Sequence, residues 1–100
     1  MDQVLRNKLD EVRAAMKMYH VRHAYAFGSV CTAFFNEKSD IDLLVSFNEM
    51  AIEDYADNYF NLLYQLQHIL ERDVDLLTEN ALKNPYFIKV INRSKTPIYE

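Results

Sequence analysis

The sequence is short of the residues that interrupt secondary structure or cross-link a chain. Among 100 residues it has one glycine, two prolines, one cysteine and no tryptophan. A single cysteine excludes an intramolecular disulfide, which fits a reducing, cytoplasmic setting. No apolar run approaches the roughly 18 residues needed to cross a bilayer, so we expect no membrane association. The first twelve residues are polar and mixed in charge, unlike a secretory signal.

An excess of basic residues is also missing. The chain has 11 Lys and Arg against 15 Asp and Glu, a formal net charge of −4. Domains that grip a nucleic-acid backbone usually carry a basic excess, so the balance disfavours a nucleic-acid partner. Half of the residues are hydrophobic, which is ordinary for a globular protein, and the length suits one domain over residues 1–100.

Hydrophobic spacing predicts helices that alternate with strands. A leading helix carries apolar residues from Leu5 to Tyr19, and a second long helix carries them from Ile52 to Leu70. Strands are predicted at residues 21–27, 40–47 and 74–78, where β-forming residues gather. Interleaved helices and strands around one sheet predict an α/β or α+β fold.

The C-terminal segment is predicted to form a third helix and a short strand. Asn84-Pro85 is a good helix start, because Asn can cap and Pro is tolerated in the first turn. Phe87, Val90 and Ile91 follow as the expected buried stripe. Pro97 should stop the helix, with a final strand after it.

Two aspartates open the second predicted strand. Asp40 and Asp42 are two residues apart, so their side chains point to the same face, while the residues between and after them point to the core. Neighbouring carboxylates raise each other's pKa unless a cation sits between them. Mg²⁺ prefers such oxygen ligands. Taken alone, the pair is a weak signal, and two solvated acids at a strand entry would be the simpler interpretation.

Two further features surround this acid pair. Gly28-Ser29 follows the first strand, and a glycine there would let a phosphate approach the backbone, although an ordinary turn would also use it. In the third strand, Asp75 precedes apolar residues just as Asp42 does. Asp75 would complete a three-carboxylate site if the strands are neighbours, and Asp73 is its rival on the same face.

Together these residues resemble a known signature. Gly28-Ser29, a ten-residue gap and Asp40-Ile41-Asp42 are similar to the G-S-x10-D-x-D pattern of the DNA polymerase β-type nucleotidyltransferase superfamily. The chain looks most like its minimal nucleotidyltransferase (MNT) group, along most of its length. The resemblance implies an α+β fold with a small mixed sheet packed against helices.

The resemblance also implies roles for these residues. Gly28 and Ser29 would hold the nucleoside triphosphate, ATP in the first instance. Asp40, Asp42 and Asp75 would be the catalytic residues and the ligands of two Mg²⁺ ions. The expected reaction moves AMP to a hydroxyl on a protein partner, with the chain as the antitoxin of a toxin–antitoxin pair and a helical HEPN-type protein as its partner. The alternative is a weak or inactive binding subunit that neutralises a partner; a homo-oligomer also stays open.

The segment between the two motif halves departs from the family pattern. Relatives often carry Arg and Gly after Gly-Ser, whereas Lys38 is the only cation between Ser29 and Asp40. Phosphate would then be met by Arg72, Lys89 or Arg93. Phe34-Phe35 in this segment is a partner contact if exposed and a loop anchor if buried.

Two other reactive side chains have simpler interpretations. Cys31 lacks a recognisable histidine partner, so we expect a small buried thiol rather than a nucleophile. His23 lies on the same face of its predicted strand as Val21 and Tyr25, which favours a histidine that is packed or at the boundary of the core.

Overall fold

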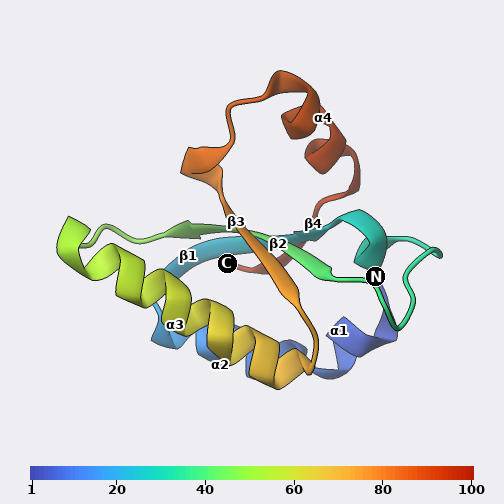
Figure 1. Ribbon diagram of the computed structural model, residues 1–100, viewed down its shortest axis with the longest axis horizontal. Helices are drawn as coiled ribbons and strands as arrows, with labels where there is room; N and C mark the ends of the chain where they lie inside the picture. Colours follow the sequence, from blue (N-terminus) through green and yellow to red (C-terminus); the bar gives the residue numbers. More distant parts are fainter.

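A mixed four-stranded sheet forms the centre of the computed structural model, which describes residues 1–100 (Figure 1). Its strand order is β3-β2-β1-β4, with β1 antiparallel to both β2 and β4, and β2 parallel to β3. The strands are β1 (Val21–Phe27), β2 (Ile41–Phe47), β3 (Val74–Thr78) and β4 (Thr96–Tyr99). The helices are α1 (Gln3–Asn7), α2 (Leu9–Met18), α3 (Ile52–Leu70) and α4 (Pro85–Ser94), with 3₁₀ turns η1 (Gly28–Cys31) and η2 (Glu79–Ala81).

The main core lies between the sheet and the pair α2 and α3, which lie side by side below it in Figure 1. Strand alternation sends Ile41, Leu43 and Val45 of β2 into this core, where all three are fully buried, as the sequence pattern predicts. Leu62 and Leu66 of α3 meet them from the helix side. The α+β fold class is confirmed.

A smaller apolar cluster occupies the other face of the sheet, under α4. Phe27, Leu44 and Ile91 are its buried members. Asn84 caps α4 as expected, since its Oδ1 accepts from the backbone N–H of Tyr86 at 3.0 Å. The prediction of a buried stripe is wrong in part, because Phe87 is 41% and Val90 56% exposed. Only one edge of α4 meets the sheet, so the residues beside Ile91 remain at the surface.

Several predicted boundaries shift. The leading helix is divided into α1 and α2 at Lys8, whose backbone is not helical. The segment that follows β1 forms the 3₁₀ turn η1, which begins at Gly28. Pro97 lies inside edge strand β4, where a missing N–H is tolerated. None of the helices combines the length and hydropathy of a membrane span.

Candidate active site

The sheet register brings the predicted site residues to one end of three neighbouring strands. Asp42 of β2 lies opposite Phe27 of β1, the residue before Gly28. On its other side, the parallel pairing places Asp42 opposite Asp75 of β3. Asp40 is exposed, one residue before β2 begins. Gly28, Asp42 and Asp75 therefore meet although 47 positions separate the first from the last.

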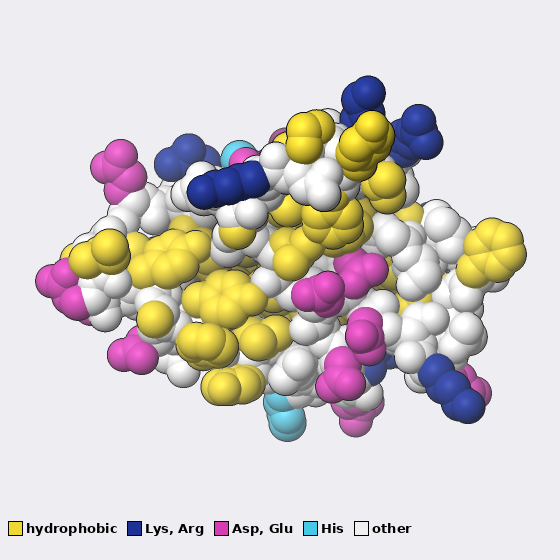
Figure 2. Space-filling view, turned by 45° about the horizontal axis from the view of Figure 1, so that its top comes forward, with side chains coloured by type: hydrophobic (Ala, Val, Ile, Leu, Met, Phe, Trp, Pro, Cys, Tyr) yellow, Lys and Arg dark blue, Asp and Glu magenta, His cyan; other side chains and the backbone are white.

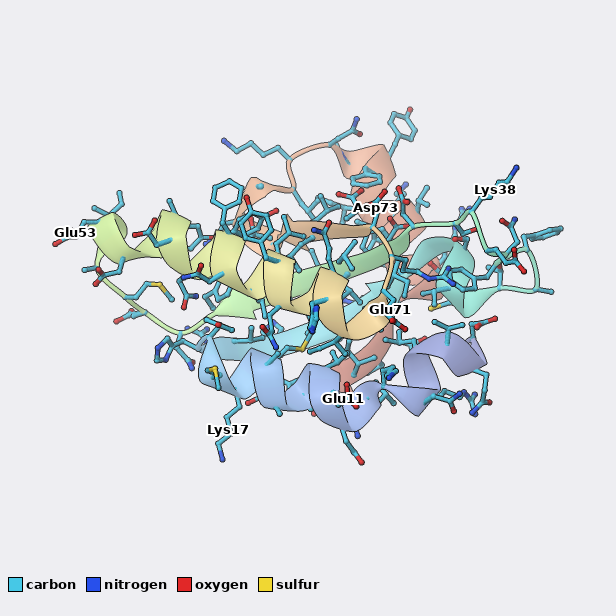
Figure 3. All side chains as sticks on the ribbon, turned by 60° about the horizontal axis from the view of Figure 1, so that its bottom comes forward. Glu11, Lys17, Lys38, Glu53, Glu71 and Asp73 are labelled. Atoms are coloured by element: carbon cyan, nitrogen blue, oxygen red, sulfur yellow. The ribbon has the colours of Figure 1, made fainter.

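The same register decides between the two candidate acids of the third strand. Asp75 pairs with Asp42, whereas Asp73 lies before β3, where its carbonyl accepts from the N–H of Ile41 at 3.1 Å. Figure 3 labels Asp73 near the turn that leads into the strand. Asp75 is therefore the acid adjacent to Asp42.

Gly28 lies in direct contact with the Asp42 carboxylate. Its φ of +72° belongs to the left-handed region, which residues other than glycine rarely adopt. A Cβ at this position would lie 2.5 Å from Asp42 Oδ2. The only glycine in the chain is thus required both by its backbone conformation and by the acid beside it.

The Gly28 turn is supported from α4 and from within η1. The backbone N–H of Gly28 donates to Ser94 Oγ at 3.4 Å. Within η1, the half-buried Ser29 accepts at its carbonyl from the N–H and the hydroxyl of Thr32, each at 2.9 Å. Ser94 was not anticipated, and no motif in the sequence points to it because the contact spans 66 residues.

The acids are not balanced by basic side chains. The ion pair of the structure is His23 with Glu79, at 2.9 Å, and no Lys or Arg pairs with Asp40, Asp42 or Asp75. Partial burial, and then the charges of Asp75 and Asp40, raise the pKa of Asp42 to about 6. The site therefore holds negative charge that lacks a protein counter-ion, and a cation would relieve it.

This donor set suits Mg²⁺, a hard ion that prefers oxygen. No group of three His, Cys, Asp or Glu side chains is arranged to hold an ion by itself. Asp42 and Asp75 supply an adjacent pair of carboxylates, and one or two carboxylates completed by phosphate oxygens is a common Mg²⁺ arrangement. The residues fit a metal that arrives with a phosphate-bearing substrate.

Arg72, a possible phosphate ligand on the sequence alone, binds backbone carbonyls of the segment that precedes Asp40. Its Nη1 donates to the carbonyls of Asn36 at 3.2 Å and Ser39 at 3.0 Å, and its guanidinium lies 4.6 Å from the centre of the Phe35 ring. These contacts hold the connector just before Asp40. Phe35 is half-buried and anchors the loop, whereas its neighbour Phe34 is 84% exposed.

The remaining cations lie away from direct contact with the acids. Lys38 projects outward from the connector (Figure 3). Lys89 and Arg93 are exposed on α4 and form no ion pair. Of the reactive residues set aside in the sequence, Cys31 is half-buried with its Sγ 3.6 Å from Thr96 Oγ1, and His23 is a boundary histidine paired with Glu79.

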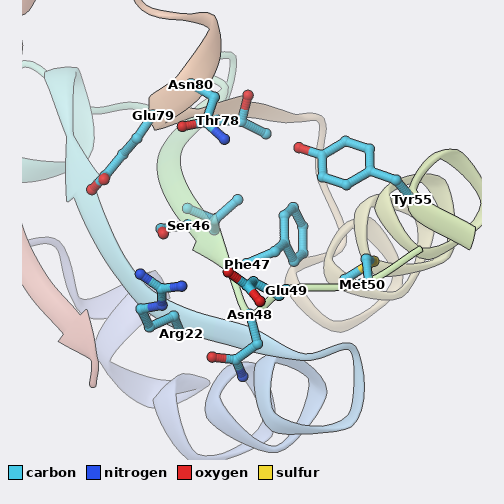
Figure 4. Close-up of a pocket in the computed structure, with 11 residues that line it drawn as sticks. Arg22, Ser46, Phe47, Asn48, Glu49, Met50, Tyr55, Thr78, Glu79 and Asn80 are labelled. Atoms are coloured by element: carbon cyan, nitrogen blue, oxygen red, sulfur yellow. The ribbon is translucent and has the colours of Figure 1, made fainter. Parts of the chain in front are cut away.

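A polar cavity of about 300 Å³ lies at the opposite ends of β2 and β3 (Figure 4). Its lining includes Ser46 and Thr78 together with Arg22, Glu49 and Glu79. It contains none of the three aspartates, so it is separate from the acid cluster.

Comparisons with known proteins agree with this geometry. The sequence model described as polymerase beta nucleotidyltransferase matches residues 8–100. Two proteins of Methanocaldococcus jannaschii named "putative protein adenylyltransferase" are similar to the chain. One is 37% identical, covering 73% of this chain and 72% of the relative, and the other is 42% identical, covering 73% and 71%.

Solved structures show the same fold. One described as a "putative minimal nucleotidyltransferase" superposes with a TM-score of 0.79 at 28% identity, covering 97% of this chain and 96% of the other. A Shewanella oneidensis complex of a tri-AMPylated HEPN toxin with its MNT antitoxin has a TM-score of 0.65 at 16% identity, covering 93% and 70%. A toxin–antitoxin structure with AMP-PNP has a TM-score of 0.68 at 19% identity, covering 92% and 70%.

The fold, and the turn at Gly28 with Asp42 and Asp75 beside it, therefore define a small nucleotidyltransferase. The chain belongs to the polymerase β nucleotidyltransferase family, and its enzymatic class is nucleotidyl transfer.

Proposed function

We propose that this single-domain chain is a cytoplasmic, Mg²⁺-dependent protein adenylyltransferase that moves AMP from ATP to a hydroxyl of a helical HEPN-type partner, as the antitoxin of a pair. The observation that carries the proposal is the uncompensated acid cluster, Asp42 beside Asp75, next to Gly28. The relatives named as protein adenylyltransferases support the AMP donor, and the fold shared with MNT antitoxins supports the partner class.

Each site residue has a physical role in this reaction. Gly28 and Ser29 would accommodate the triphosphate at a turn whose glycine has no side chain of its own. Asp40, Asp42 and Asp75 would hold two Mg²⁺ ions, which would neutralise charge on the phosphates. Because the pKa of Asp42 is about 6, this carboxylate is ionised and able to bind a cation above that pH.

The transfer step balances as an in-line displacement. The acceptor hydroxyl oxygen forms a bond to the α-phosphorus, the bond from that phosphorus to the bridging oxygen of the β-phosphate breaks, and pyrophosphate leaves. The hydroxyl proton passes to the Asp75 carboxylate, which is exposed at the edge strand of the sheet and therefore accessible to an acceptor.

The test uses the chain, a HEPN-type protein encoded beside it, and ATP labelled on the α-phosphate. We expect label on the partner only with Mg²⁺, and none with Asp42→Asn or Asp75→Asn. The variants should still bind the partner, measured by gel filtration. Label that persists in both variants would remove the acids from the mechanism.

The alternative function is a binding subunit that occludes its partner with weak or no transfer. The segment between Ser29 and Asp40 favours it, because Lys38 is the only cation there and its side chain points outward. It predicts tight binding of the partner without label under any condition. Mass spectrometry of the partner after co-expression separates the two functions.

A further inference from the structure

An apolar groove begins beside the acid cluster and runs along the open edge of the sheet. Its walls are Tyr55, Ala56, Tyr59 and Phe60 of α3, and Leu76 and Leu77 of β3, and it encloses about 350 Å³. Asp75 does not line the groove itself, but it directly precedes Leu76 on this edge strand, so the groove begins next to the acid that we propose accepts the hydroxyl proton. Figure 2 shows hydrophobic side chains gathered next to acidic ones on this face.

The groove is bordered by an unusual amount of exposed aromatic surface. Phe60 is 48% and Tyr64 61% exposed, and their rings stack at 6.2 Å between centroids. The Tyr59 ring packs edge-on against Phe60 at 5.2 Å. A continuous apolar surface of this kind marks an interaction site rather than an ordinary surface.

The charges around the groove specify what can cover it. Helix α3 has no Lys or Arg, and its acids Glu53 and Asp57 lie in the chain on either side of the groove residues Tyr55 and Ala56, whereas Asp54 lines a different pocket. Figure 3 shows Glu53 at the outer end of this helix. A second copy of the chain would bring these acids against their own equivalents, and a nucleic acid would bring phosphates against them. The complementary occupant is a polypeptide that is both apolar and basic.

The distance from Asp75 to the far end of the groove gives the spacing between two recognised side chains of this polypeptide. The groove shares Tyr55 and Thr78 with the polar cavity, which holds the acids Glu49 and Glu79 and the cation Arg22. Glu79 pairs with His23, and Glu49 forms no ion pair. Glu79 lies four positions after Asp75, about 13 Å along an extended chain. An extended segment that starts at Asp75 therefore reaches Glu49 and Glu79 after about four of its own residues.

We propose that this groove docks the acceptor polypeptide, receiving a large apolar side chain next to the modified hydroxyl and a Lys or Arg about four residues away beside Glu49 and Glu79. This inference rests on the proposed protein adenylyltransferase function, and it adds the recognition rule of the acceptor. The groove thereby confers specificity on a domain that has no separate substrate-binding module in residues 1–100.

The test uses twelve-residue peptides with a central tyrosine, made with the flanking residues in both chain directions. One set carries Leu at two and Arg at four residues from the tyrosine, a second replaces Leu by Ser, and a third replaces Arg by Glu. Binding is measured by fluorescence anisotropy without nucleotide, and transfer by label from ATP with Mg²⁺. We expect the first set to bind and to be labelled at least tenfold better than the other two.

Variants of the groove make the result specific. Ala56→Arg fills the groove at an exposed helix position and should weaken binding of the first set at least tenfold. Ala14→Arg makes the same change at an exposed position of α2 and should have no effect. Glu49→Lys should shift the preference from the Arg peptides to the Glu peptides.

Each outcome decides between the two proposals. Binding in the groove without label supports the docking site and contradicts the protein adenylyltransferase function. Label that is equal across the sets and insensitive to Ala56→Arg supports the function and overturns the docking site. No binding and no label overturn both. A dimer in sedimentation that Ala56→Arg dissociates would assign the groove to a second copy.

Discussion

Gly28 and Asp42 lie so close that a methyl group on Gly28 would stand 2.5 Å from Asp42 Oδ2. This contact links the turn after β1 to the acid at the start of β2. We expect Gly28→Ala to destabilise the protein by about 1–3 kcal/mol, because alanine is strained at φ +72° and the Asp42 side chain must move. Urea denaturation measures the loss.

A double-mutant cycle isolates the contact. In Asp42→Ala the carboxylate is absent, so adding Gly28→Ala should cost only the backbone strain, about 1 kcal/mol. Equal costs in the two backgrounds would show that the carboxylate does not constrain the glycine.

Asp42 makes stability depend on pH. Burial and the neighbouring acids raise its pKa from 3.8 to about 6, so its protonated form is favoured in the folded state. The resulting stabilisation is fully present below pH 3.8 and is lost as the pH rises through 6. Asp42→Asn, which cannot ionise, should therefore be more stable than the wild type at pH 7.5, by about 1–2 kcal/mol after allowing for solvent screening.

Thermal denaturation at a series of pH values tests whether Asp42→Asn stabilises the protein at neutral pH. The gain from Asp42→Asn should disappear near pH 3.5. A variant that is less stable than the wild type at pH 7.5 would mean that the carboxylate is stabilised there by a partner. Addition of Mg²⁺ with a non-hydrolysable ATP analogue should raise the melting temperature of the wild type and not that of the variant.

Arg72 holds the connector that leads to Asp40. Arg72→Met removes hydrogen bonds to the Asn36 and Ser39 carbonyls and the contact over Phe35. We expect a loss of about 1–2 kcal/mol and faster amide exchange in residues 36–40. Transfer should require more Mg²⁺, because Asp40 becomes less constrained. Arg93→Met, at an exposed arginine without an ion pair, is the matched control and should leave exchange in the connector unchanged.

Tyr59 fastens the edge strand beside Asp75. Its hydroxyl donates to the Leu76 carbonyl at 2.5 Å, and burial and the charge of Asp75 raise its pKa, which keeps the proton on the hydroxyl. Tyr59→Phe should cost about 1 kcal/mol and speed amide exchange in β3. Tyr64→Phe, at a ring that is 61% exposed, should do neither. If both variants behave alike, the hydroxyl of Tyr59 does not hold the strand.

The sequence predicts much of this architecture because local patterns dominate it. Strands β1 and β3 were expected at their observed bounds, and β2 begins one residue later than expected. The period-2 pattern of β2 correctly sends Ile41, Leu43 and Val45 to the core and leaves Asp42 on the other face. The place of Asp42 and of Asp75 before apolar strand residues makes both of them candidates on the sequence alone.

Patterns in the sequence do not predict contacts between segments that are far apart in the chain. Phe34 and Phe35 are adjacent in the chain, yet Arg72 anchors one while the other is exposed. Phe87 and Val90 follow a helical apolar stripe, yet only Ile91 of that stripe is buried. Periodicity shows which side of an element is apolar, but it does not show how closely another element covers that side.

Alternation and spacing in the sequence alone determined the strands, the face of β2 that carries Asp42, and the importance of the lone glycine, and they left the α/β and α+β classes open. The tertiary structure alone decided that Asp75 rather than Asp73 pairs with Asp42, that Arg72 binds carbonyls, and that Gly28 is in contact with a carboxylate. The physical reason is the sheet register, since hydrogen bonds between β2 and β3 fix which residues are opposite, and side-chain periodicity along one strand carries no information about its neighbour.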